Sequence, residues 1–219
     1  MSKKFSNRIQ AGQMLAQHLQ AYSNLGNVLV LALPRGGVPV AFEVAKFLNV
    51  ALDVCIVRKL GVPGHKELAM GAIAQGLTGQ FAGENITIFN QDVIDSLGID
   101  QEKITAVVNQ ELRELRRRHQ IYRGDKPAIN VKNKIVILID DGIATGASMR
   151  AALTVIHQQQ PEKIVVAVPV APLTTCEELR LEVDDVVCLR CPEVMSAIGF
   201  WYEDFSQTTD NEVRALLVN

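Results

Sequence analysis

The sequence predicts an α/β fold, a doubly wound parallel sheet flanked by helices. Two observations support this: short runs rich in β-branched residues alternate with helical segments, and glycine-containing loops lead from strand to helix. Short apolar runs are typical of strands buried on both faces. Their alternation with helices favours parallel pairing through right-handed crossovers. The runs expected to form strands are residues 28–33, 52–57, 136–139, 164–170 and 186–189.

Length and composition indicate a globular chain with a substantial core. Of its 219 residues, 48% are hydrophobic and 21% are charged, as is usual for globular domains. We expect a single domain over residues 1–219. A helical insertion is predicted at about 90–123, and small additional elements at about 190–219.

Charge and cysteine content exclude several classes of protein. The net charge of −2 gives no general attraction to nucleic acid or to anionic membranes. The first residues lack the apolar core of a signal peptide, no apolar run is long enough to span a bilayer, and four cysteines do not suggest a disulfide framework. We therefore expect a cytoplasmic, reduced protein with neither nucleic acid nor membrane as a partner.

One strand and its loop carry the strongest functional signal. The apolar run 136–139 is followed by two adjacent carboxylates, Asp140 and Asp141, and by a loop of small residues that enters a helix near Ala147. Ligands of parallel sheets bind at the carboxyl edge, and such a loop can direct its N–H groups at an anion. An Asp-Asp turn before an N-capped helix is the alternative interpretation.

Carboxylates beside an anion-binding loop suit a ligand that carries vicinal hydroxyls next to a phosphate, such as ribose 5-phosphate. The stretch 136–148 resembles the ribose-phosphate motif of type I phosphoribosyltransferases. The resemblance implies that Asp140 and Asp141 hold the ribose hydroxyls and Mg²⁺, the metal through water. The residues implied to bind the ribose and its 5-phosphate are Gly142, Ala144, Thr145, Gly146, Ala147 and Ser148.

A second glycine loop follows the first predicted strand. It reads Pro34-Arg35-Gly36-Gly37 and leads into a helix predicted over 38–48. Paired glycines permit close approach of the backbone, and Arg35 adds a fixed positive charge. In the family that the chain resembles, this loop binds pyrophosphate and often contains a cis peptide, which assigns that role to Arg35, Gly36 and Gly37. A tight strand-to-helix turn is the alternative.

A basic segment follows the strand predicted over 52–57. Residues 58–67 contain two glycines, a proline, three cations and a histidine, which favours a mobile loop that closes over a polyanion. Arg58 and Lys59 resemble the Arg-Lys that opens the flexible loop of the adenine and orotate enzymes. The resemblance makes Glu67 a candidate proton donor or acceptor, with His65 and Lys66 stabilising charge. A solvated surface loop is the alternative.

Two helical regions lie outside these motifs. Ser6 is expected to cap a first helix over about 7–22, and Asp100 a long helix within the insertion. The long helix ends in the basic run 111–119, for which a solvated face is the default interpretation and contact with another subunit or with phosphate the alternative.

The C-terminal segment combines aromatic residues and a cysteine pair. Phe200 and Trp201 lie in a stretch that faintly resembles the hood of the 6-oxopurine enzymes, where an aromatic ring would stack on a base; core packing is the alternative. Cys188 and Cys191 have the spacing of half a zinc site or of a redox pair. Since no second such pair accompanies them, we interpret them as structural.

The resemblance implies transfer of a 5-phosphoribosyl group between 5-phosphoribosyl-1-pyrophosphate (PRPP) and a small-molecule acceptor. Mg²⁺ is the implied cofactor, nucleobase salvage the implied role, and a homodimer the implied assembly. Ala144 stands where the 6-oxopurine enzymes carry an Asp, which favours an adenine-type acceptor. The alternative is a regulator that binds the ribose donor or a nucleotide without turnover.

Overall fold

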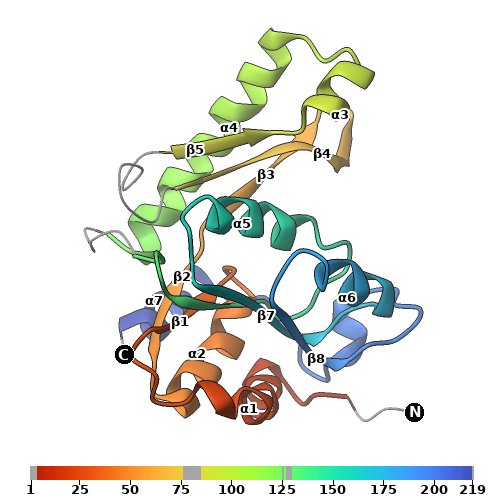
Figure 1. The fold of residues 1–219 in the computed structure, drawn as a ribbon. Coiled ribbons are helices and arrows are strands. Elements are labelled where there is room, and N and C mark those ends of the chain that lie inside the picture. The colour runs from red at the N-terminus through yellow and green to blue at the C-terminus, as the bar shows by residue number, and fades with distance from the viewer. Residues whose placement is uncertain (1–3, 76–84, 125, 127–129, 219) are drawn as a thin grey trace. The chain divides into compact units, whose positions relative to one another are not determined.

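The computed structural model of the chain describes residues 4–75, 85–124, 126 and 130–218 (Figure 1). These residues form two compact units. Unit 1 comprises Met1–Cys55, Val131–Gly146 and Pro161–Asn219, and unit 2 comprises Ile56–Asn130 and Ala147–Gln160.

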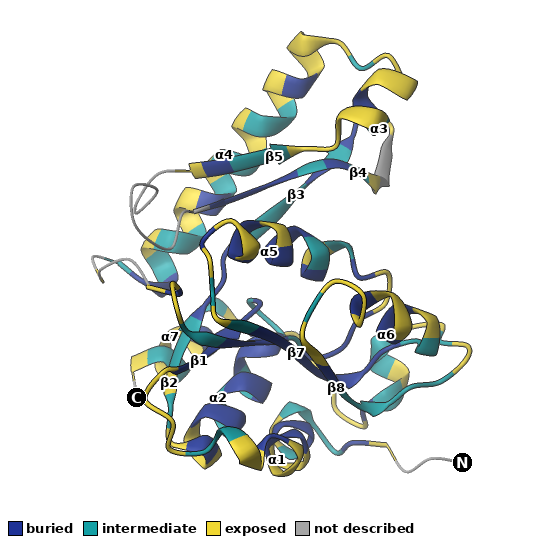
Figure 2. Cartoon of the chain, viewed as in Figure 1, coloured by how far each residue is buried: buried dark blue, intermediate teal, exposed yellow. Residues whose placement is uncertain are grey.

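Unit 1 is built on a parallel sheet that contains five strands among the described residues, in the order β2-β1-β6-β7-β8. Every neighbouring pair runs parallel, so the predicted fold class is confirmed. Strands β1, β6 and β7 are almost entirely buried, and Figure 2 shows β7 as a dark blue ribbon. The strands are β1 Val28–Ala32, β2 Ala51–Val54, β6 Ile135–Ile139, β7 Lys163–Val170 and β8 Asp185–Arg190.

Helices of unit 1 flank this sheet, and α1 and α2 lie together on the same side of it (Figure 1). The helical elements of unit 1 are α1 Arg8–His18, η1 Gln20–Tyr22, α2 Gly37–Leu48, α6 Leu173–Leu179, η3 Ile198–Trp201 and α7 Asp210–Val218. The first helix is shorter than predicted, and its cap is Asn7, whose side chain accepts a hydrogen bond from the Gln10 amide at 3.0 Å. The prediction that Ser6 caps this helix was wrong. The backbone amide of Ser6 donates to the Gln10 side chain, and Asn7 is the residue whose side chain caps the helix.

Unit 2 contains an antiparallel sheet of three strands among the described residues, in the order β3-β4-β5, together with three helices. One apolar cluster joins this sheet to α3 and α4, and a second joins it to α5 through Val155. Neighbouring residues Ile73 and Ala74 of β4 belong to different clusters, so both faces of the sheet are covered. The elements are β3 Val57–Val62, β4 His65–Gln75, β5 Asn85–Phe89, α3 Gln91–Ser96, α4 Gln101–Tyr122 and α5 Ala147–His157.

The prediction of a loop over residues 58–67 was wrong, because this segment forms the β3–β4 hairpin. Leu60 and Val62 alternate along β3 and are buried in the cluster that includes Met70. Pro63 and Gly64 form the turn, where Gly64 has a φ of 82° that favours glycine. Burial of alternate apolar residues therefore outweighed the turn signals of proline and glycine.

The helical insertion predicted at about 90–123 is present as α3 and α4. The Asp100 side chain caps α4 as expected, accepting from the Lys103 amide at 2.8 Å. At the basic end of α4, Arg117 and Arg118 pair with Glu114 at 2.8 Å, within the helix itself. Among the described residues, no helix is both long enough and apolar enough to cross a membrane.

Candidate active site

The two candidate binding loops of unit 1 leave neighbouring strands of the sheet. Strands β1 and β6 pair in parallel, so their carboxyl ends lie side by side. The Leu33 amide, just beyond β1, donates to the Ile139 carbonyl at 2.8 Å. The arginine-glycine loop and the paired carboxylates therefore meet at one edge of the sheet, although they are far apart in sequence.

Gly36 and Gly37 lie directly against the carboxylates. A Cβ atom on Gly36 would overlap the Asp141 carboxylate, and one on Gly37 would lie 2.7 Å from the Ile139 carbonyl oxygen and 2.9 Å from the Asp140 Cα. No L-side chain fits at such distances without a shift of its neighbours. The two glycines are therefore required by packing, in addition to any role in binding a ligand.

Asp141 is held by a cation that the sequence did not reveal. Its side chain is buried, and its Oδ2 accepts from Nε of Arg8 at 2.8 Å. The Arg8 guanidinium also donates from Nη1 to the Ser206 carbonyl at 2.7 Å and lies 4.0 Å from the centre of the Phe205 ring. Nothing local marks Arg8 in the sequence, because its partner lies 133 residues away.

The adjacent carboxylates differ in their partners. Burial raises the pKa of Asp140 well above its usual value, and the negative charge of Asp141 raises it further. Burial also raises the pKa of Asp141, but the Arg8 guanidinium opposes this shift. Asp140 Oδ1 accepts from the Asp141 amide at 2.8 Å, which orients the side chain. Asp140 is therefore the group of this pair that more readily holds a proton.

We expect Asp140→Asn to stabilise the protein at neutral pH and to remove part of its pH dependence. The native pKa of Asp140 is raised, so between the unfolded value of about 3.9 and the native value the folded state binds more protons, and stability falls as the pH rises. Each tenfold difference in proton affinity between the folded and unfolded states changes the free energy of unfolding by about 1.4 kcal/mol. Denaturant unfolding of both proteins at pH 4 to 8 measures the difference, which should grow with pH.

The control is Asp92→Asn, at an exposed position in the first turn of α3. We expect it to change the free energy of unfolding by less than about 1 kcal/mol, through the helix dipole alone. In the Asp140→Asn protein, the new amide oxygen can still accept from the Asp141 amide, so a loss of structure is not expected. A stability difference that stays constant with pH would contradict the raised pKa.

The C-terminal segment packs against the carboxylate loop and supports its backbone. The Tyr202 hydroxyl donates to the Asp141 carbonyl at 2.6 Å, and the Tyr202 ring is buried against Phe5 and Phe205. Phe5 forms a backbone bridge to Tyr202, which ties the beginning of the described chain to this segment. A Cβ on Gly142 would lie 2.7 Å from Ile198, so the loop packs closely against η3. Sequence reasoning missed Tyr202 because its role depends on these distant contacts.

The two predicted stacking residues occupy different environments. Trp201 is partly buried and packs against the cluster around Phe5 and Tyr202. The Phe200 side chain is 67% exposed. Phe200 is therefore the candidate that has an accessible ring, whereas Trp201 contributes to the packing of the C-terminal segment.

Arg35 lies on the arginine-glycine loop, where its guanidinium is 3.6 Å from the Asp210 carboxylate at the start of α7. Both side chains are about 30% exposed, so the pair is accessible to solvent and readily exchanged for another anion. The peptide bond between Pro34 and Arg35 is cis, as the resemblance implied.

The loop that follows the carboxylates is fixed to the fold at Ile143, and the two residues after Ile143 are exposed. Ile143 is buried, and its amide donates to the Val170 carbonyl at 2.9 Å. Ala144 and Thr145 are exposed, and Gly146 has a φ of 76°, which favours glycine. Ala147 and Ser148, the last residues of the motif, begin α5 in unit 2.

The remaining candidates belong to unit 2. Arg58 Nη2 lies 2.6 Å from the Glu111 carboxylate of α4, and Lys59 follows Arg58 on β3. His65, Lys66 and Glu67 begin β4, but their side chains lie outside the described residues.

Comparison with known proteins shows the family of the chain. The model of the phosphoribosyl transferase domain matches residues 5–202. The chain belongs to the type I phosphoribosyltransferase family. The crystal structure of TT1426 from Thermus thermophilus is 40% identical, with a TM-score of 0.83, and the match covers 98% of each chain. A Mycobacterium tuberculosis protein provisionally described as a phosphoribosyl transferase is 43% identical over 215 residues. That match covers 98% of this chain and 46% of the relative, so the chain spans about half the length of the curated relatives it matches.

In this member of the phosphoribosyltransferase family, Asp140 and Asp141 are the candidate metal-binding groups. Carboxylate oxygens are ligands that Mg²⁺ prefers, directly or through water. Both residues directly follow β6 at the edge of the sheet, and the raised pKa of Asp140 means that protons would compete with Mg²⁺ for this carboxylate. The residues present therefore fit the cation that the family implies.

Proposed function

We propose that the chain transfers a 5-phosphoribosyl group between PRPP and a nucleobase, with pyrophosphate as the leaving group. The observation that carries this proposal is the direct contact of Gly36 and Gly37 with the paired carboxylates. Through this contact, a loop suited to pyrophosphate lies beside groups suited to ribose hydroxyls, within one unit. PRPP carries both chemical features on a single sugar.

In the proposed reaction, the bond between ribose carbon 1 and the pyrophosphate oxygen breaks and its electron pair leaves with pyrophosphate. A nitrogen of the acceptor bonds to carbon 1 and loses its proton to solvent. Asp140 and Asp141 accept hydrogen bonds from the ribose hydroxyls. The Arg8 guanidinium favours the ionised form of Asp141 and fixes the position of its carboxylate. Arg35 exchanges Asp210 for the departing pyrophosphate, whose growing negative charge it stabilises. The 142–146 loop, which Val170 and Ile198 hold in place, binds the 5-phosphate.

Asp140 and Asp141 would hold Mg²⁺ through water. When bound, the metal neutralises charge on the pyrophosphate oxygens and orients them for departure. Because Asp140 holds a cation best in its ionised form and burial raises its pKa, we expect Mg²⁺-dependent donor binding to strengthen as the pH rises through the pKa of this group.

The acceptor proposal depends on two exposed residues. Ala144 offers no carboxylate to a purine ring nitrogen, so an adenine-type base is favoured over guanine and hypoxanthine. The exposed Phe200 ring is the candidate surface for stacking the base.

The first test measures Mg²⁺-dependent PRPP binding by calorimetry and pyrophosphate release against a panel of purines, pyrimidines and small amines. We expect donor binding, and release that depends on one acceptor. Arg35→Ala should weaken donor binding and reduce turnover by about 10²-fold or more, because it removes a charge from the leaving group. Asp140→Asn should reduce both while the fold persists.

Arg116→Ala is the matched control, because Arg116 is an exposed arginine on α4 outside the proposed site. We expect it to leave binding and turnover unchanged. Unaltered activity in both Arg35→Ala and Asp140→Asn would refute the proposed site. Tight PRPP binding without release for any acceptor would refute transfer and favour a sensor of the donor.

A further inference from the structure

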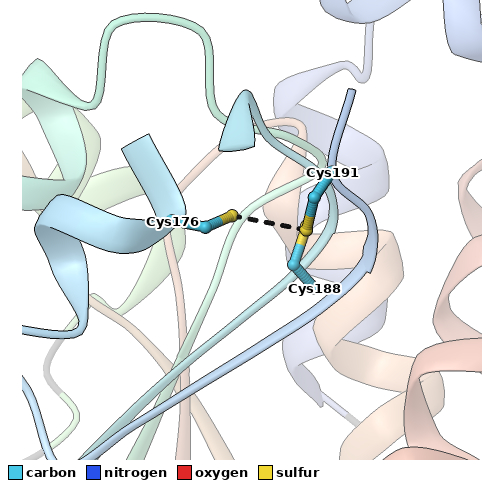
Figure 3. Close-up of side chains that lie close together, drawn as sticks. All are labelled: Cys176, Cys188 and Cys191. Carbon is cyan, nitrogen blue, oxygen red and sulfur yellow. Dashed lines mark hydrogen bonds between the residues drawn. The ribbon is translucent and has the colours of Figure 1, made fainter. Parts of the chain in front are cut away.

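Three of the four cysteines converge in unit 1, on elements other than the carboxylate loop. Cys176 lies on α6, Cys188 on β8, and Cys191 directly after β8. Their three sulfur atoms lie within 4.8 Å of one another, with the sulfurs of Cys176 and Cys191 3.6 Å apart. Figure 3 shows the Cys176 side chain pointing from its helix toward the other two sulfurs. Among the described residues, no other group of three His, Cys, Asp or Glu side chains is placed in this way.

The spacing of the sulfurs suits ligands of one metal ion. Zn²⁺ binds thiolate sulfur at about 2.3 Å in tetrahedral geometry, which puts two ligand sulfurs about 3.8 Å apart. The separation of 3.6 Å between Cys176 and Cys191 is close to that value. It is far beyond the S–S bond length of about 2.05 Å, and all three cysteines are free thiols.

We propose that Cys176, Cys188 and Cys191 bind a thiophilic divalent metal ion, with Zn²⁺ the best match, and that the fourth coordination position is open to water. On binding, each coordinating thiol loses its proton to solvent and donates a sulfur lone pair to the metal. No oxidation or reduction is involved.

Burial and charge around the cluster agree with this assignment. Cys176 is buried, whereas Cys188 and Cys191 are only partly buried, so an ion can reach the sulfurs and a water can occupy the remaining position. Three thiolates and Zn²⁺ together leave one negative charge. Arg180, at the end of α6, lies near enough to act on the charge of both Cys176 and Cys191. Its guanidinium can offset this charge.

A metal at this position would link α6 to the segment after β8, which leads to η3 and Tyr202 and supports the candidate active site. The Leu173 amide of α6 already donates to the Pro192 carbonyl at 2.9 Å, beside Cys191. The chain then continues to η3 and to Tyr202, which donates to the Asp141 carbonyl. Bound Zn²⁺ would add a second link between α6 and this segment, so its effect is structural and lies outside the reaction itself.

The test titrates the reduced, metal-free protein with Co²⁺ and then with Zn²⁺. We expect one Co²⁺ per chain, with a thiolate-to-cobalt charge-transfer band and the intense visible bands of tetrahedral Co²⁺, both lost on addition of Zn²⁺. We expect each single serine variant to weaken Zn²⁺ binding by at least about 100-fold: Cys176→Ser, Cys188→Ser and Cys191→Ser. This loss of affinity exceeds the one typical of replacing a residue that only hydrogen-bonds to a metal ligand. Hydrogen exchange over residues 191–201 should slow when Zn²⁺ binds.

Cys55→Ala is the matched control, because Cys55 is the one cysteine outside the cluster and is buried. It should leave the cobalt spectrum and the Zn²⁺ affinity of the folded protein unchanged. The proposal is overturned if no charge-transfer band forms, or if the band survives in all three serine variants. Formation of a Cys176–Cys191 disulfide under mild oxidation, in a protein that binds no metal when reduced, would also overturn it.

Discussion

Arg8→Met is expected to lower the free energy of unfolding by about 3–5 kcal/mol and to abolish PRPP binding. Arg8 is the cation that pairs with the buried Asp141 carboxylate, at 2.8 Å. Removing one member of a buried ion pair leaves the other charge uncompensated, which costs several kcal/mol. The loss also removes the hydrogen bond to Ser206 and the contact with the Phe205 ring, so the C-terminal segment loses an anchor. Denaturant unfolding and calorimetry measure the two effects.

A double-mutant cycle separates the charge effect from lost packing. If the uncompensated charge dominates, Arg8→Met combined with Asp141→Asn should be more stable than Arg8→Met alone. Gln17→Met, at an exposed position of α1, should change stability by less than about 0.5 kcal/mol. Additive effects in the cycle would show that Arg8 stabilises the fold without coupling to Asp141, contrary to this prediction.

Gly36→Ala should weaken PRPP binding by about 100-fold or more and destabilise the fold by about 1–3 kcal/mol. The new Cβ would overlap the Asp141 carboxylate, which cannot retreat without losing its contact with Arg8. Overpacking of a buried contact has a cost of this size, and a displacement of about 1 Å at a binding group is enough for a 10²-fold loss. Calorimetry with PRPP and Mg²⁺ measures the first effect, and denaturant unfolding the second.

Gly26→Ala provides the steric control. Gly26 precedes β1, a Cβ added to it would have no neighbour within 4 Å, and its backbone is not in the left-handed conformation. We expect this substitution to leave PRPP binding unchanged. If Gly36→Ala binds PRPP as tightly as Gly26→Ala does, the two loops are not packed together in the way described.

The alternation of strands and helices was predictable because each depends on local sequence. The apolar run 136–139 became β6, and the run 28–33 contains β1, since strands of a covered parallel sheet must be apolar on both faces. Asp100 was identified as the cap of α4 because its effect acts over three residues.

The errors arose where tertiary burial outweighed local signals. Residues 58–67 carry two glycines and a proline, yet Leu60 and Val62 bury their side chains and make the segment a strand. The interpretation of Cys188 and Cys191 as structural stays a prediction, but the sequence pattern indicated only these two cysteines, which are close together in the chain. Cys176 joins them because α6 packs against β8, and no local pattern indicates that contact.

The sequence by itself determined the strand–loop–helix units and the chemistry of their loops, including the paired carboxylates and Arg35. These features depend on residue type and short-range spacing. Only the tertiary structure showed that Gly36 lies against Asp141, that Arg8 supplies its counter-charge, and that Tyr202 supports its backbone. Parallel pairing and the return of the C-terminal segment bring these residues together across 61 to 133 positions. Contacts at such separations follow from packing of the whole unit, which local patterns do not encode.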